Sequence, residues 1–185
     1  LESTPGYNPE PGAVQPTGRN LDVAMKGGAW LAVQATDGTE AYTRAGALDV
    51  DAEGLLVTRT GLTALGDGGP ISVPRNAQLQ IGSDGTVSAK VGDAKPQVVG
   101  RLKLVTPDKP LERGTDGLFR ATDGELPADA EARLQDGALE GSNVSPVETM
   151  IAMIAAARQF EQQMKMVHSA QETEQAATKL LSTGG

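Results

Sequence analysis

The sequence predicts a mainly β protein, an irregular domain of several hairpins, that ends in one long α-helix. Up to residue 140, short apolar runs alternate with turn signals, among them six Asp-Gly pairs. From Val147 to Leu181 the chain contains neither glycine nor proline, and its apolar residues recur at the three- and four-residue spacing of a helix. We therefore expect three parts: an extended arm or linker (1–19), a β-rich domain (20–140) and a C-terminal helical segment (141–185).

The arm holds four prolines and three glycines without an apolar period, so we expect no regular structure there. After it, the LDVDAEGLLVT and QIGSDGTVSAKV segments predict two hairpins, because aspartate and glycine are suited to tight turns. The stretch 107–140 has few apolar anchors, and we expect irregular loops and edge strands in it. The predicted strands cover residues 21–26, 30–35, 41–44, 47–50, 55–60, 79–81, 86–91 and 98–105.

The helix has a clear start in the sequence. Ser145, Pro146 and Glu148 form a capping box with proline at the first helical position, where its missing N–H costs nothing. Beyond this cap, apolar residues line one face with the spacing of a coiled coil. We call this face the seam; its residues are Met150, Met153, Ile154, Ala157, Phe160, Met164 and Val167.

A helix of about 36 residues that begins near Ser145 spans roughly 54 Å at 1.5 Å per residue. A β-domain of this size can cover only part of that length, so we expect a second helix to cover the rest of the seam. The chain begins at Leu1 rather than methionine. We therefore expect an N-terminal segment upstream of it, and the partner helix within that segment.

Composition argues against several functions. A formal charge of −8 and a pI near 4.7 disfavour nucleic acid and anionic membrane surfaces as partners. No apolar run is long enough to insert in a membrane, and the chain has no cysteine. The single histidine, His168, lacks a second nitrogen or sulfur ligand for a metal site. We find no catalytic motif, so we predict no catalytic residues, no cofactor and no enzyme activity.

One short motif leaves an alternative open. DVDAEG at 49–54 resembles the first half of a calcium-binding loop, but Thr60 stands where the loop needs a glutamate. We favour a hairpin turn and keep an extracellular calcium-binding β-module as a distant alternative. A carbohydrate-processing or carbohydrate-binding protein is disfavoured because aromatic residues make up only 3% of the chain.

Three segments carry a resemblance to a known family. They are GRNLDVAMKGGAWLAVQATDGTEAYTRAGALDVDAEGLLVTRTG at 18–61, IGSDGTVS at 81–88 and LEGSNVSPVETMIAMIAAARQFEQQMK at 139–165. Together they resemble the flagellar basal-body rod and hook proteins over nearly the whole chain. The C-terminal ending is most similar to the proximal-rod branch, and a distal-rod or hook subunit is the nearest alternative. The chain departs from the family at Gly28-Ala29-Trp30-Leu31, where a Gly-Phe-Phe-like stretch is usual.

The resemblance implies a structural subunit that self-assembles into a helical tube in the basal body and transmits torque. It implies export by the flagellar type III system, an outer β-domain, and an assembly helix paired with an N-terminal helix. The expected partners are other rod subunits and neighbouring rod and hook proteins. The resemblance gives no role to residues 107–135, which we therefore leave unassigned in lateral contacts between subunits.

Overall fold

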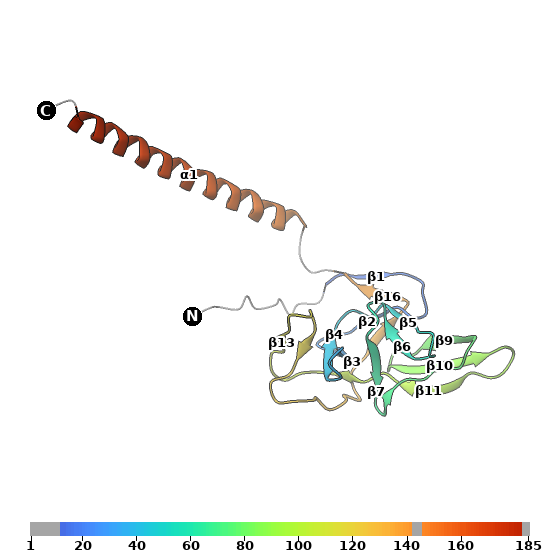
Figure 1. The fold of residues 1–185 in the computed structure, drawn as a ribbon. Helices are drawn as coiled ribbons and strands as arrows, with labels where there is room; N and C mark the ends of the chain where they lie inside the picture. Colours follow the sequence, from blue (N-terminus) through green and yellow to red (C-terminus); the bar gives the residue numbers. More distant parts are fainter. Residues whose placement is uncertain (1–11, 142–145, 183–185) are drawn as a thin grey trace. The chain divides into compact units, whose positions relative to one another are not determined.

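The computed structural model describes residues 12–141 and 146–182. The chain divides into two compact units, Leu1–Asn143 and Val144–Gly185. The described part of the first unit is built from short strands, and the second contains one helix, α1 (Pro146–Ser182) (Figure 1). The predicted fold class, mainly β with one long C-terminal helix, is confirmed.

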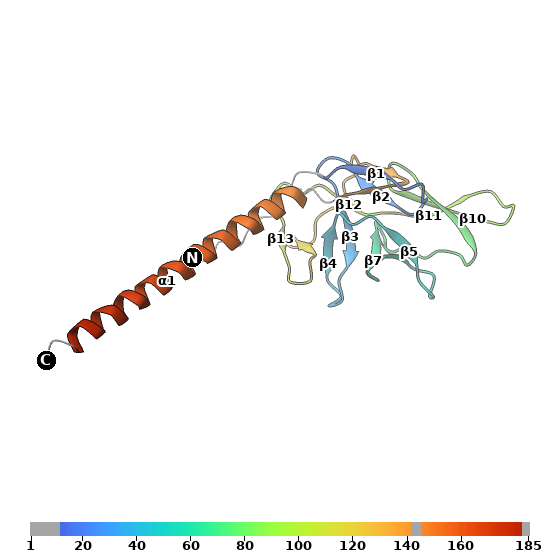
Figure 2. The ribbon, with the colours of Figure 1, turned by 90° about the horizontal axis from the view of Figure 1, so that it is seen from above.

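The larger sheet of the β unit is antiparallel throughout its pairs. Its main path runs β13-β14-β4-β3-β7-β6-β5, while β12 pairs with β3 and β8 with β7. Both views show β3, β4 and β7 side by side at its centre (Figures 1 and 2). The bounds are β3 (Trp30–Gln34), β4 (Glu40–Thr43), β5 (Leu48–Val50), β6 (Leu56–Thr58), β7 (Thr63–Gly66), β8 (Gly69–Pro70), β12 (Leu104–Val105), β13 (Glu112–Arg113) and β14 (Phe119–Arg120).

A second sheet and two ribbons complete the unit. The second sheet has three antiparallel strands in the order β11-β10-β9. The ribbons are β1 with β16 and β2 with β15, both antiparallel. The bounds are β1 (Val14–Pro16), β2 (Val23–Met25), β9 (Ala77–Ile81), β10 (Thr86–Val91), β11 (Gln97–Arg101), β15 (Leu134–Asp136) and β16 (Ala138–Glu140).

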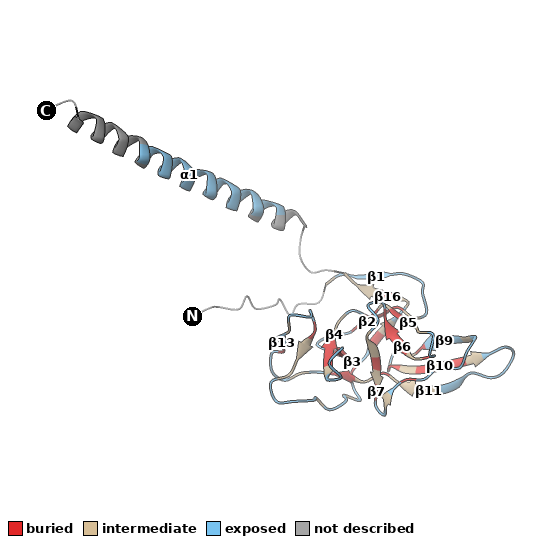
Figure 3. Ribbon diagram, viewed as in Figure 1, coloured by how far each residue is buried: buried red, intermediate tan, exposed pale blue. Residues whose placement is uncertain are grey.

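The core of the β unit lies where these sheets meet (Figure 3). Leu31, Leu56, Ile81, Leu102 and Leu134 are all at most 1% exposed and belong to one cluster. They come from the larger sheet, the second sheet, a loop and the β15–β2 ribbon, so burial of their apolar surface joins segments distant in sequence. A second cluster packs Trp30, Ala32, Tyr42, Val105 and Leu111 together.

Both predicted hairpins are confirmed. In the first, Val50 pairs with Leu56 across the turn, and in the second Val87 pairs with Ile81. Five of the six Asp-Gly pairs have the positive φ on their glycine, as at Gly85 with φ 85°. At the 67–68 pair the positive φ is on Gly69 instead.

Two expectations about strands were wrong, and the strands β7 and β8 were not predicted. The run 98–105 is not one strand: β11 and β12 belong to different sheets, because the chain crosses between them at Leu102 and Lys103. The arm 1–19 is not without regular structure, since β1 pairs with β16 from the other end of the unit. β7 was not predicted, yet it lies between β3 and β6 in the larger sheet.

Candidate assembly site

The seam lies on the described part of α1 and presents its apolar side chains to solvent. Ala157 is exposed, and each of the other six seam side chains is more than half exposed, from 53% at Met164 and Val167 to 68% at Met153. Ile151 is exposed beside them. These exposed large apolar side chains lie on one helix face and form an apolar surface on the described part of α1.

The sequence reading did not single out Met166, which is 68% exposed on the same helix. It follows Met164 by two positions, which is about 200° around an α-helix, so it lies away from the seam. Its exposure matches that of Met153. Met166 therefore offers an equally exposed methionine on the helix as an internal comparison for the seam.

The predicted helix cap is described only in part. The helix begins at Pro146, as the cap predicts, although Ser145 and the side chain of Glu148 lie outside the described residues.

His168 is exposed on the helix. Across the described ranges, 12–141 and 146–182, no group of three His, Cys, Asp or Glu residues is arranged to hold a metal ion.

The strand that leads toward the helix is paired with the strand that begins the β unit. Val14 lies opposite Glu140 and Pro16 opposite Ala138, and the Gly141 N–H donates to the Ala13 carbonyl at 2.9 Å. We call this β1–β16 pair the exit ribbon. Because its strands are antiparallel, the chain before Val14 and the chain after Glu140 leave the ribbon at the same end.

A charged clamp holds the exit ribbon on the larger sheet. The Arg44 Nε atom donates to Glu140 Oε2 at 2.7 Å, and both side chains are at most 15% exposed. The Arg44 guanidinium also donates to the carbonyls of Gly27 and Ala29 at 3.1 Å and of Met25 at 3.3 Å. The second oxygen of Glu140 accepts the Gly12 N–H at 2.9 Å. The clamp thus connects the end of β4 with β16 and with Gly12, just before β1.

Trp30, the residue in the stretch that departs from the family pattern, packs into this region. Its ring lies under the Arg44 guanidinium, 5.7 Å from the ring centroid, which is within range of a cation–π interaction. Phe119 packs on it with 4.7 Å between ring centroids. The indole therefore links the clamp to β14, which belongs to the stretch with few apolar anchors in the sequence.

The remainder of that stretch is held by a buried polar network around Tyr42. The Tyr42 hydroxyl donates to Glu40 Oε1 at 2.8 Å and accepts the Leu126 N–H at 2.7 Å. Lys103 pairs with Glu40 at 2.8 Å, and both of these side chains are at most 15% exposed. Burial, followed by the neighbouring Glu40 carboxylate, raises the pKa of Tyr42 to about 12. The neutral phenol thus fixes the irregular segment to the sheet.

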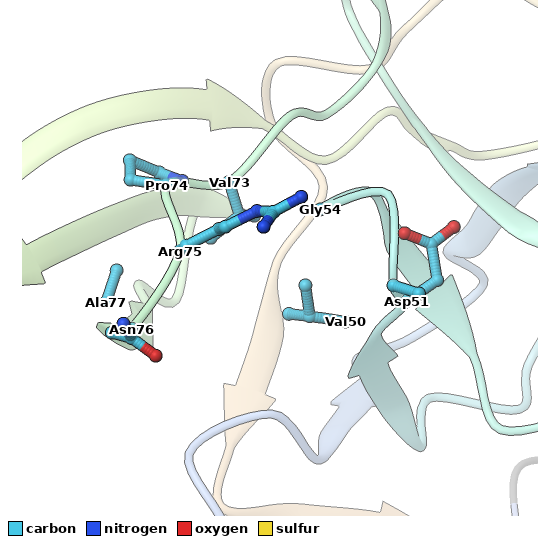
Figure 4. Close-up of a pocket in the computed structure, with 9 residues that line it drawn as sticks. Val50, Asp51, Gly54, Val73, Pro74, Arg75, Asn76 and Ala77 are labelled. Carbon is cyan, nitrogen blue, oxygen red and sulfur yellow. The ribbon is translucent and has the colours of Figure 1, made fainter.

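The DVDAEG segment forms a turn whose carboxylates bind backbone groups. Asp51 accepts the Leu55 N–H at 2.7 Å, and Asp49 accepts the Val50 N–H at 2.9 Å. A surface pocket of about 440 Å³ lies between this turn and the loop before β9. Arg75 extends across the pocket, while the Asp51 carboxylate points away from it (Figure 4). The two carboxylate–backbone hydrogen bonds are those of a structural turn.

Among the described residues, no helical segment combines the length and the hydropathy needed to cross a bilayer.

Two family models match the chain. The model of the flagellar hook protein FlgE/F/G D1 domain matches residues 24–89, within the β unit. The model of the flagellar basal body rod FlgEFG protein C-terminal region matches residues 135–180, which include β16 and most of α1.

Individual relatives agree with these matches. The chain is 48% identical to the flagellar basal-body rod protein FlgF of Salmonella typhimurium and 47% identical to that of Escherichia coli, in each case over 97% of this chain and 76% of the relative. It is 36% identical to the rod protein FlgG of Bacillus subtilis over 91% of this chain and 68% of that protein. The chain therefore belongs to the FlgE/F/G family of flagellar basal-body rod proteins, as a FlgF-like structural rod subunit of the basal body.

Proposed function

We propose that this chain is a subunit of the proximal part of the rod and that it assembles into a helical tube through the seam of α1. In this proposal the β unit is the outer domain, and the assembled tube transmits torque. The subunit reaches the rod through the flagellar type III export system and performs no catalysis. Its partners are further copies and the neighbouring rod and hook proteins.

The observation that carries the proposal is the seam itself. Its large side chains are more than half exposed, and burying each of them against a partner is worth about 1.5–3 kcal/mol. In an isolated subunit this apolar surface stays in contact with water, which is unfavourable in free energy. Repeated burial from subunit to subunit without closure builds a tube rather than a closed oligomer.

We propose further that the covering helix comes from the N-terminal region of the rod protein. The exit ribbon supports this assignment, because the chain that precedes Val14 and the chain that follows Glu140 run together at one end of the ribbon. A helix upstream of Val14 and the helix α1 would therefore both be connected to the same end of the exit ribbon. Coiled-coil pairing would then cover the apolar positions at spacings of three and four.

The experiment replaces Phe160 and Met164 by Asp in the full-length rod protein of a flagellated bacterium. Placing two carboxylates in an apolar contact costs several kcal/mol, so we expect at least a roughly 100-fold loss of rod incorporation and loss of motility. The control is Met166→Asp, which puts one aspartate on the same helix away from the seam and should leave incorporation intact. Normal motility in the double variant, or an equal defect in the control, would contradict the proposal.

A further inference from the structure

The hairpin formed by β10 and β11 projects from the β unit, and no role has been assigned to it (Figure 1). Residues 91–98 are exposed without interruption. Val98 is 69% exposed and Val91 47%, and among the described residues of the β unit only Val14 joins them as an exposed large apolar side chain. We call residues 88–98 the finger. Exposed large apolar side chains on an edge hairpin are a feature of contact surfaces, because an isolated protein gains nothing from them.

The outer face of the finger combines one apolar side chain with positive charge. Val98 lies opposite Ser88 in the ladder, and Lys90 follows Ser88 by two positions, so Val98 and Lys90 share a face. Lys95 lies in the loop between the strands. The finger carries two lysines against one acid, Asp93, whereas the whole chain has 24 acidic and 16 basic residues. Its charge is thus opposite to that of the chain that carries it.

A small pocket elsewhere on the β unit has the complementary character. It encloses about 120 Å³, and its apolar lining comes from Pro107, Pro110, Ala121 and Leu126. The other lining residues are Asp108, Lys109, Thr122 and Asp123, so two acids face one base. That volume corresponds to on the order of four water molecules and suits one branched aliphatic side chain. Both aspartates are exposed.

The carboxylates beside this pocket are available to a new partner. Asp108 forms no ion pair with another described residue. Asp123 pairs with Lys109 at 2.6 Å, but both side chains are about 70% exposed. Such surface pairs are worth at most about 1 kcal/mol, so exchanging Lys109 for a lysine of another subunit costs little. The next residue but one, Glu125, is also exposed and adds negative charge.

We propose that the finger of one copy docks on this pocket of a second copy, with Val98 in the pocket and Lys90 and Lys95 beside Asp108 and Asp123. The positive charge of the finger is complementary to the aspartates beside the pocket. Because both surfaces belong to the same chain, we take a second copy of the chain as the partner. Since the finger and the pocket are different surfaces of the same chain, the contact is head-to-tail, which is the kind of contact that a helical tube requires. The inference rests on the proposed assembly and names a lateral contact for it.

The first test uses the absence of cysteine from the chain. With Val98→Cys and Ala121→Cys on one chain, oxidation of assembled rods should give a ladder of covalent dimers and larger multiples. Either substitution alone should give none, and a mixture of the two single variants should stop at dimers. Rods that assemble normally without a ladder, or cross-linking by Val98→Cys alone, would overturn the proposal.

The second test reverses the charges. Lys90→Glu with Lys95→Glu should lower rod incorporation by about ten-fold, because like charges then face one another, and adding Asp108→Lys with Asp123→Lys should restore it. Arg75→Glu, an exposed basic residue outside the finger, is the control and should change nothing. A finger variant that incorporates normally while the Phe160/Met164 variant fails would overturn this contact and leave the seam assembly standing.

Discussion

Replacing Arg44 by methionine tests whether the clamp holds the exit ribbon on the sheet. The substitution keeps an unbranched apolar stem but leaves Glu140, which is 10% exposed, without its cation. Removing one partner of a buried ion pair costs about 3–5 kcal/mol. Since the pair retains slight solvent access, we expect a loss of about 3 kcal/mol in the free energy of unfolding of the β unit. That is a large part of the roughly 5–15 kcal/mol of a typical domain.

The assay is urea unfolding followed by the fluorescence of Trp30, the single tryptophan, which lies under Arg44. With an m value of about 2 kcal/mol/M, the midpoint should fall by roughly 1.5 M. Arg44→Lys keeps the charge but loses the forked donor, and we expect a loss of about 1–2 kcal/mol. The exposed Arg120–Asp116 pair provides the control, since Arg120→Met should cost less than about 1 kcal/mol.

A double-mutant cycle makes the test specific. Arg44→Met with Glu140→Met removes both charges, so the loss should be smaller than the sum of the single losses by about 2 kcal/mol. If Arg44→Met shifts the midpoint no further than Arg120→Met, or if the cycle shows no coupling, the clamp does not stabilise the exit ribbon and the reasoning from burial is refuted.

Two further predictions concern the β unit. Gly46→Ala should cost more than about 3 kcal/mol, because the new Cβ would overlap the Val23 carbonyl oxygen, whereas Gly68→Ala has open space and should be near neutral; equal melting temperatures for the two variants would contradict this. Raising the pH above 10 should destabilise the unit by on the order of 2 kcal/mol by pH 12, because unfolded tyrosine loses its proton at about 10 while Tyr42 keeps it to about 12. Unfolding measured against pH should lose this component in Tyr42→Phe, and an unchanged alkaline slope would refute the assignment.

The parts of the fold that could be predicted are those set by neighbours in sequence. The helix follows from a stretch without glycine or proline and from Pro146 at its start. The hairpins follow from Asp-Gly turns such as Asp84-Gly85, where the carboxylate accepts the Thr86 N–H at 3.1 Å and the glycine takes the positive φ. These interactions span two to four residues, so their pattern can be recognised in the sequence.

The clamp and the Tyr42 network could not be predicted in this way. Arg44 and Glu140 are 96 residues apart, and Tyr42 and Leu126 are 84 apart. Neither pair carries a local signal, because arginine, glutamate and tyrosine occur in many environments. Likewise, the break between β11 and β12 depends on which sheet each half joins, and the apolar pattern of residues 98–105 is the same in either case.

By itself, the sequence determined the mainly β class, the turn positions, the start of the helix and its apolar seam, and the resemblance that led to the rod family. Each of these depends on local spacing or on the chemistry of single residues. Only the tertiary structure decided that β1 joins β16, that Arg44 clamps this ribbon, and that an exposed finger and an acidic pocket occupy different surfaces of one unit. Such contacts form between segments distant in sequence, because burial of apolar surface depends on which segments meet in space. It does not produce a periodic pattern that could be recognised in the sequence.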